Sequence, residues 1–173
     1  MENKNLEIER KLLIALPDED MLCCLDGVSV YRISQTYLSA EPGTTERVRK
    51  RESNECVEYF HTVKKRISAL TRIEDESLID EREYEELLHR KKEGTVTLEK
   101  TRYAFPYKGH IVEIDVFPFM KNVAFLEVEL ESEDETFELP EFVNVIEDVT
   151  SDGRYTNAAL ARIDRERLPC ENN

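Results

Sequence analysis

The stretch Leu6-Glu7-Ile8-Glu9-Arg10-Lys11-Leu12 decides how the rest of this chain is interpreted. Successive side chains of a β-strand point to opposite faces, so Glu7, Glu9 and Lys11 share one face. Two carboxylates one pleat apart suit a hard cation, and the neighbouring ammonium can meet an anion that the cation attracts. If the other strands repeat this alternation, the protein is built around a charged interior.

Length and charge narrow the classes of function. The 173 residues predict a single domain over residues 1–173 with a sizeable core. The chain carries 24 Lys and Arg against 38 Asp and Glu, a formal net charge of -14. This balance argues against nucleic-acid and anionic-membrane partners, because both depend on a positive field. A small polyanion held in a local basic pocket with a divalent metal remains compatible with it.

Cysteine usage indicates a reducing, cytoplasmic setting. The four cysteines are Cys23, Cys24, Cys56 and Cys170, and none of them forms a C-x-x-C pair. We expect Cys23, Cys24 and Cys56 to be small core residues rather than nucleophiles. The N-terminus turns charged at once, so no signal peptide is expected.

Alternation and turn residues predict eight strands and few helices, a mainly β, α+β fold. A helix that groups Leu12, Leu13 and Leu16 is an alternative for the first strand. The clearest helix is capped by Asp80, with Glu83 completing a capping box. The expected strands cover residues 6–16, 28–38, 46–51, 57–67, 70–78, 95–105, 110–117 and 124–131, and the expected helices begin at Asp18, Asp80 and Arg154, with a possible short one within 132–142.

Paired charges at spacing two recur on seven of these strands. Exposed charges over an apolar core are the usual arrangement, and the pattern alone favours it. The alternative is a barrel with a charged, hydrated lumen. One detail favours this alternative: acids group with acids and bases with bases, whereas a solubilising surface usually intersperses them. Such a lumen suits a polyphosphate bound with Mg²⁺ or Mn²⁺.

The paired charges belong to a series of short motifs that follow one another along the chain. These motifs are Glu7-Ile8-Glu9-Arg10-Lys11, Gln35-Thr36-Tyr37-Leu38, Arg47-Val48-Arg49, Thr62-Val63-Lys64, Arg72-Ile73-Glu74-Asp75-Glu76, Lys100-Thr101-Arg102-Tyr103, Glu113-Ile114-Asp115-Val116-Phe117, Glu127-Val128-Glu129 and the tail Val149–Asn157. In this order they resemble the motifs of the CYTH superfamily, the triphosphate tunnel metalloenzymes. One departure is Thr36, where the family often has Gly. The joint order of the motifs over residues 6–160 favours the charged lumen.

The resemblance implies an eight-stranded antiparallel closed tunnel that takes a small triphosphate with Mg²⁺ or Mn²⁺. By the same resemblance, the phosphate-binding residues would be Lys11, Arg47, Arg49, Lys64, Lys100 and Arg102. The metal ligands would be Glu7, Glu9, Glu127 and Glu129. The catalytic residues, holding a second metal or orienting the attacking water, would be Glu74, Glu76 and Asp115, with Arg72 paired to these acids.

Three functions follow from this resemblance. The favoured one is a metal-dependent triphosphatase acting on inorganic triphosphate or a related small triphosphate, as a monomer or homodimer. The alternatives are a class IV adenylyl cyclase and a non-catalytic polyphosphate- or nucleotide-binding module.

Two further residues carry expectations of their own. His61 is expected on the outer face of its strand, and Tyr155 either contacts the substrate or only packs against other side chains.

Overall fold

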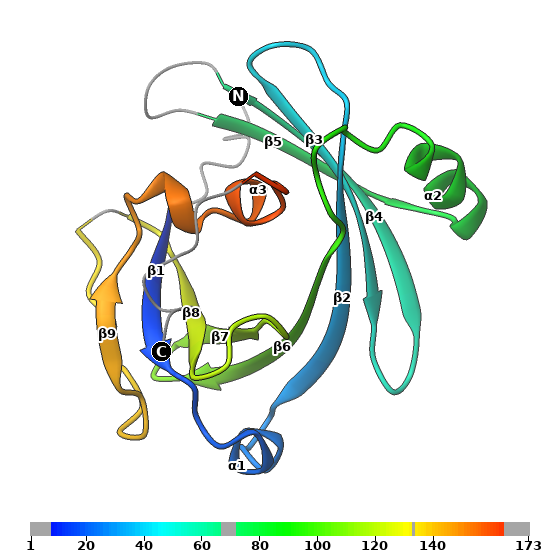
Figure 1. Ribbon diagram of the computed structural model, residues 1–173. Helices are drawn as coiled ribbons and strands as arrows, with labels where there is room; N and C mark the ends of the chain where they lie inside the picture. The colour runs from blue at the N-terminus through cyan, green and yellow to red at the C-terminus, as the bar shows by residue number, and fades with distance from the viewer. Residues whose placement is uncertain (1–7, 67–71, 133, 165–173) are drawn as a thin grey trace. The chain divides into compact units, whose positions relative to one another are not determined.

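The computed structural model describes residues 8–66, 72–132 and 134–164, and it is mainly β (Figure 1). All of the strand pairs described below are antiparallel, as the sequence predicts. The strands are β1 (Ile8–Ala15), β2 (Ser29–Leu38), β3 (Thr44–Glu52), β4 (Val57–Arg66), β5 (Arg72–Ile79), β6 (Leu98–Tyr107), β7 (His110–Val116), β8 (Val123–Leu130) and β9 (Val145–Asp148). The helices are α1 (Glu19–Cys23), α2 (Glu81–Leu88), the 3-10 turn η1 (Gly153–Tyr155) and α3 (Asn157–Leu160).

Contacts group the chain into two compact units, which are described one at a time. Unit 1 comprises residues 33–98 and 157–165, and unit 2 comprises residues 7–32 and 99–156, with the two chain ends assigned to one or the other. The single domain expected over residues 1–173 stays a prediction.

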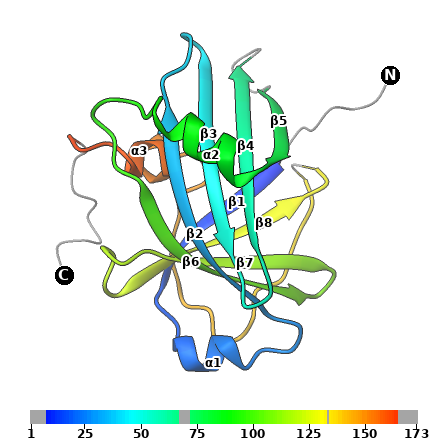
Figure 2. The ribbon, with the colours of Figure 1, turned by 90° about the vertical axis from the view of Figure 1, so that its right-hand side faces the viewer.

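In unit 1, strands β5, β4 and β3 are followed in hydrogen-bonding order by β2. Helix α2 begins where the sequence predicts, because the Asp80 carboxylate accepts the Glu83 backbone N–H at 2.8 Å. It contacts β3 and β4, as Figure 2 shows, and buries Tyr84 against Leu38 and Val48. Tyr59 adds a ring contact at 4.9 Å between centroids. One face of this sheet is therefore an apolar layer covered by a helix.

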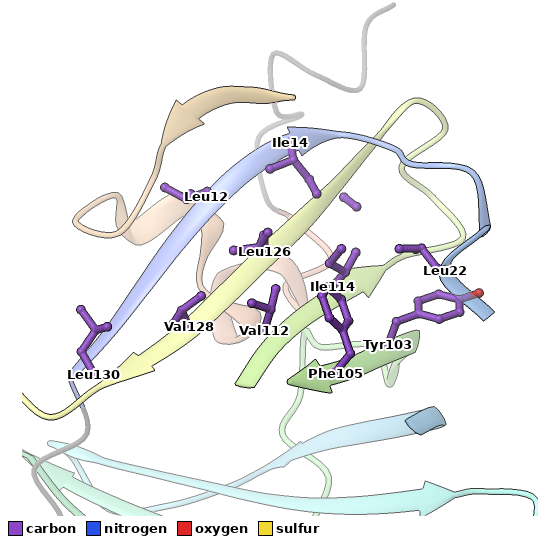
Figure 3. Packing of buried hydrophobic residues seen from close by; sticks show 11 residues of the cluster. Leu12, Ile14, Leu22, Tyr103, Phe105, Val112, Ile114, Leu126, Val128 and Leu130 are labelled. Carbon is purple, nitrogen blue, oxygen red and sulfur yellow. The ribbon is translucent and has the colours of Figure 1, made fainter. Parts of the chain in front are cut away.

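In unit 2, the strand order is β6-β7-β8-β1-β9. The apolar side chains of four of these strands gather on one side of the sheet together with Leu22 of α1 (Figure 3). Leu12, Leu126 and Ile114 lie opposite one another in register across β1, β8 and β7. Phe105 and Tyr103 of β6 complete the cluster. This face is a conventional hydrophobic core.

The centre of the opposite, charged face of unit 2 is also buried. Lys11 and Lys100 are each 6% exposed, and Asp115 is fully buried. Of the two arrangements that the alternation allowed, this unit therefore has the one in which the charges point inward.

Hydrogen bonds do not close the sheet into the predicted eight-stranded barrel in the part of the chain that the structure describes. The strands follow one another in the order β5-β4-β3-β2-β6-β7-β8-β1-β9. Strand β1 pairs with β8 along one edge and with β9 along the other. Strand β9, a short ninth strand that the sequence did not predict, occupies this second edge at Leu12–Ile14.

The C-terminal part of the chain differs from the prediction. The helix expected over residues 154–165 is replaced by η1 and the four-residue α3, because Thr156 between them is extended, with φ -68° and ψ 146°. No helix occurs within the described residues of 132–142. None of the described helices has the length and apolar character needed to cross a membrane.

The three cysteines expected in the core are exposed. Helix α1 is short and buries only Leu22, so Cys23 and Cys24 at its end face solvent. Cys56 lies in the β3–β4 turn, where its backbone N–H donates to the Ser53 hydroxyl. The expectation of small buried thiols was therefore wrong at these positions.

We expect Ile114→Ala to lower the free energy of unfolding by about 3 kcal/mol, because Ile114 is fully buried in the unit 2 cluster. Ile111 on the same strand is 54% exposed, and Ile111→Ala should cost about 0.5 kcal/mol or less. Urea unfolding of both variants measures the difference. Equal losses would contradict the assignment of the core face.

Candidate functional site

The register of unit 2 brings acidic and basic side chains together on the charged face. Lys11 of β1 lies opposite Glu127 of β8, and Glu113 of β7 lies opposite Glu127 on its other side. Arg102 of β6 lies opposite Asp115 of β7. Alternation keeps all of these side chains on one side of four strands, so the strands themselves place the charges.

Asp115 is the centre of this group. Its Oδ2 accepts from Lys100 Nζ at 2.5 Å, and its two oxygens accept from Arg102 Nε and a terminal nitrogen of Arg102 at 2.7 Å each. The Arg102 contact is bidentate, the geometry that a guanidinium and a carboxylate prefer. Asp115 is fully buried, and its charge is tolerable because two cations pair with it.

Arg102 and Lys11 extend the group to two further acids. Arg102 donates to Glu127 at 2.8 Å and also forms an ion pair with Glu113. Lys11 Nζ lies 2.8 Å from the other oxygen of Glu127. We refer to Lys11, Lys100, Arg102, Glu113, Asp115 and Glu127 as the unit 2 ion cluster. Its cations and carboxylates are equal in number, so the buried face is close to neutral.

The pKa values of the most buried pair follow from this packing. Burial would raise the pKa of Asp115, but Arg102 and then Lys100 outweigh it and hold the pKa well below its usual range. Burial is the leading influence on Lys100 and lowers its pKa, and attraction to Asp115 opposes this shift. Asp115 therefore stays ionised, while the charge on Lys100 depends on a neighbouring anion.

The two glutamates of the cluster shift in opposite directions. Burial raises the pKa of Glu113, and Arg102 only partly offsets it. Burial also acts on Glu127, but the charge of Lys11, with help from Lys100 and Arg102, lowers its pKa overall. Glu113 is thus the cluster acid that gains a proton most readily.

Unit 1 carries a second charged face on the side of the sheet away from α2. Arg49 donates to both oxygens of Glu76 at 2.9 and 3.1 Å, and the Thr62 hydroxyl donates to the same carboxylate at 2.7 Å. Arg47 lies 3.9 Å from Glu76 and donates to the Gln35 side-chain oxygen at 3.4 Å. The structure thus brings Arg47 and Arg49, predicted to bind phosphate, together with Glu76, predicted to be a catalytic acid.

Two further predicted residues are placed by backbone register. Lys64 of β4 lies opposite Glu74 of β5, on the same strand pair as Thr62 and Glu76. The side chains of Arg72 and Glu74 lie outside the described residues. Their expected roles stay predictions.

The predicted metal ligands fall into two settings. Glu9 and Glu129 lie directly opposite each other on β1 and β8, and both are exposed. Glu127 is buried and engaged by Lys11 and Arg102. Glu7 lies outside the described residues. Among the residues that the structure describes, no three or more His, Cys, Asp or Glu side chains are placed so that they could hold a metal ion together. The facing carboxylates fit Mg²⁺ or Mn²⁺, which prefer oxygen ligands and retain several waters.

His61 lies on the opposite face of unit 1 from Arg47 and Arg49, as the alternation predicts. Its Nε2 is 2.9 Å from Glu46, which also accepts from Arg90 at 2.7 and 2.8 Å. Burial would raise the pKa of Glu46, but the hydrogen bonds from Arg90 and His61 lower it. Glu46 of β3 therefore links His61 of β4 to Arg90, which follows α2 in the chain.

Some contacts of the charged faces were not predicted. Glu113 belongs to the E-I-D stretch, yet no role was assigned to it; its spacing of two from Asp115 was a usable signal. The rings of Phe125 and Phe117 lie beside Lys11 and Lys100, at 4.5 and 5.7 Å from the ammonium nitrogens. No sequence signal separates these rings from ordinary core residues, since cation contacts depend on register.

Comparison with known proteins agrees with this arrangement. The CYTH domain family matches residues 5–156. An inorganic triphosphatase of Nitrosomonas europaea is 36% identical over 90% of this chain and 96% of its own length, and one of Acetivibrio thermocellus is 30% identical over 90% and 93%. A crystal structure of the inorganic triphosphatase NE1496 superposes with a TM-score of 0.58 at 34% identity, covering 91% of this chain and 95% of that one.

The fold is therefore the mainly β, antiparallel fold of the triphosphate tunnel structures. A Pyrococcus furiosus protein at 20% identity, with a TM-score of 0.52 over 73% of this chain, shares that fold. This chain is a member of the CYTH domain family.

Asp115→Asn should lower the free energy of unfolding by about 3 kcal/mol, because it leaves Lys100 and Arg102 buried without their shared anion. Glu129→Gln on the exposed pair should change it by about 0.5 kcal/mol or less. Urea denaturation at pH 7 compares the two variants. An Asp115→Asn protein as stable as the wild type would refute the central position of Asp115.

Glu46 should contribute to the acid stability of unit 1. A carboxylate whose folded pKa is lowered stabilises the protein above its unfolded value, about 4.3, and this stabilisation is lost as the pH falls through the folded pKa. Glu46→Gln should therefore be less stable than wild type at pH 7, and the difference should shrink below about pH 4. Urea unfolding between pH 7 and pH 3 tests this, with Glu85→Gln on the exposed side of α2 as the control. A difference independent of pH would contradict it.

Proposed function

We propose that this protein is a metal-dependent triphosphatase that hydrolyses inorganic triphosphate and releases phosphate. The observation that carries the proposal is the unit 2 ion cluster, in which three cations are fixed on one buried strand face. The two relatives named inorganic triphosphatase, matched over nine-tenths of the chain, support the same substrate.

The cations of the cluster would bind the triphosphate. Without a ligand, Lys11, Lys100 and Arg102 are neutralised by carboxylates of the chain itself. Phosphate oxygens can replace those carboxylates as acceptors, since ammonium and guanidinium groups donate equally well to either. Arg47, Arg49 and Lys64 of unit 1 are proposed to bind phosphate in the same way.

Glu7, Glu9, Glu127 and Glu129 are proposed as the metal-binding set. A bound Mg²⁺ or Mn²⁺ would neutralise charge that develops on the phosphate oxygens. The pair Glu9 and Glu129 supports this assignment, since the two residues lie directly opposite each other on β1 and β8 and both are exposed. Release of Glu127 from Lys11 by an incoming phosphate would add a further oxygen ligand.

Glu74, Glu76 and Asp115 are proposed as the catalytic acids that orient the attacking water or hold a second metal. Glu76 accepts hydrogen bonds from Arg49 and Thr62, so its carboxylate is held in one orientation. Asp115 stays ionised beside Lys100 and Arg102. A fixed, ionised carboxylate is the group needed to align a water for attack on phosphorus.

The test is a phosphate-release panel with tripolyphosphate, ATP and thiamine triphosphate at equal concentration. We expect one orthophosphate and one pyrophosphate per tripolyphosphate, only with added Mg²⁺ or Mn²⁺, and none with excess EDTA. Cyclic AMP formed from ATP would instead identify a cyclase. Tight tripolyphosphate binding without turnover would identify a binding module.

Variants of the exposed acid pair test the metal site. Glu129→Gln should weaken the apparent Mg²⁺ affinity, read from activity against metal concentration, by about tenfold or more, because it removes one proposed ligand. Glu141→Gln, an exposed acid of unit 2 outside the site, is the matched control and should leave the metal curve unchanged. Identical curves for Glu129→Gln and wild type would contradict the assignment of Glu129 to the metal site.

A cytoplasmic setting and a monomeric or homodimeric state stay predictions.

A further inference from the structure

The segment after β9 holds the backbone of Lys11 from one side. The Val149 N–H donates to the Lys11 carbonyl oxygen at 3.0 Å, and the Lys11 N–H donates to the Thr150 hydroxyl at 3.0 Å. The second bond is unusual for a strand, because a side chain supplies the acceptor where a backbone carbonyl normally does. Thr150 therefore continues the sheet ladder at the residue that carries the proposed phosphate-binding ammonium.

Thr150 is itself fixed by Asp148. The Thr150 hydroxyl lies 2.6 Å from Asp148 Oδ1 and 3.3 Å from the Lys11 carbonyl oxygen, and the Thr150 N–H donates to Asp148 at 3.1 Å. A hydroxyl has one hydrogen, and the shorter contact directs it to the carboxylate. This leaves a lone pair of the hydroxyl aimed at the Lys11 N–H. The Thr150 oxygen can accept from the Lys11 N–H because its own hydrogen points to Asp148.

The same segment supports the side chain of Lys11. Lys11 Nζ lies 4.5 Å from the centroid of the Phe125 ring. Tyr155 meets Phe125 edge-on at 5.8 Å between centroids, and Phe117 meets it at 5.9 Å. Phe125 is fully buried and Tyr155 is 1% exposed, so the ring under the ammonium cannot swing away.

We propose that Thr150 and Phe125, the latter supported by Tyr155, are positioning residues that hold the Lys11 backbone and ammonium in the orientation needed to receive a phosphate. The inference rests on the proposed function for the identity of that phosphate. A lysine side chain has many rotamers, and ordering it during binding weakens affinity. A lysine whose backbone is fixed by a hydroxyl, and whose ammonium lies against a ring and a carboxylate, avoids part of that loss. In this proposal Tyr155 acts through Phe125.

Thr150→Val removes the hydroxyl with little change in volume. Without the hydrogen bond to the Lys11 N–H, KM for tripolyphosphate should rise about fivefold, the equivalent of one neutral hydrogen bond, with a smaller change in kcat. Thr150→Ser keeps the hydroxyl and should restore KM to within about twofold of wild type. Thr156→Val is the matched control, because it removes a different hydroxyl from the same segment, the one that donates to the Gly153 carbonyl at 2.9 Å.

Phe125→Leu tests the second contact and also serves if Thr150→Val does not fold. It removes the aromatic ring but keeps an apolar side chain, and it should raise KM by about threefold or more, because a cation–π contact strengthens when it is desolvated. Circular dichroism and urea unfolding first establish that each variant is folded. A lower kcat without a higher KM in the Thr150→Val and Phe125→Leu variants would overturn the proposal. A Thr150→Ser protein as impaired as Thr150→Val would also overturn it.

A readout that does not depend on activity separates this inference from the proposed function. Trinitrobenzenesulfonate labels free lysine amines, and mass spectrometry gives the labelling rate of Lys11 relative to exposed Lys92 in the same sample. Wild-type Lys11 should react slowly, and Thr150→Val and Phe125→Leu should speed its labelling by about threefold or more. If wild type hydrolyses no triphosphate but these rates rise, the function fails and the positioning stands. Unchanged rates in both variants would refute the positioning whatever the activity.

Discussion

The charge of Asp115, fully buried between Lys100 and Arg102, is the constraint on which the rest of unit 2 depends. A buried carboxylate is tolerable only with cations in contact, and those cations need further anions once they too leave water. Glu113 and Glu127 meet that need through Arg102 and Lys11. The face is therefore an ionic layer that cannot be exchanged residue by residue for apolar side chains.

That layer has a chemical consequence. The acids hold the three basic side chains in place on the strand face, and under the proposed function these same side chains would meet the polyanion. The groups sit on strands rather than loops, and the hydrophobic cluster on the reverse side fixes those strands. Unit 1 is arranged in the same way. Glu76 accepts hydrogen bonds from Arg49 and Thr62 on the charged face of the sheet, and α2 covers the apolar face.

Most of the regular structure could be predicted because its signals are local. Alternation and turn residues located eight strands, the Asp80 cap located α2, and Lys108-Gly109, both at positive φ, formed the expected hairpin turn. The failures share one cause. Strand β9 has only four residues, all exposed, and exists because it pairs with β1. Cys23, Cys24 and Cys56 looked like core residues by type, but exposure depends on what packs over a helix end or a turn.

The sequence by itself determined which side chains share a face, because alternation along a strand is a property of the backbone. The order of its charged motifs also predicted the family, which is confirmed, whereas the composition of the site stays a prediction. Only the tertiary structure decided that the charged face of unit 2 is buried, that Glu127 serves Lys11 and Arg102 while Glu129 faces Glu9, and that Thr150 caps the Lys11 N–H. These outcomes depend on register and on contacts between residues up to 139 positions apart, which no local pattern records.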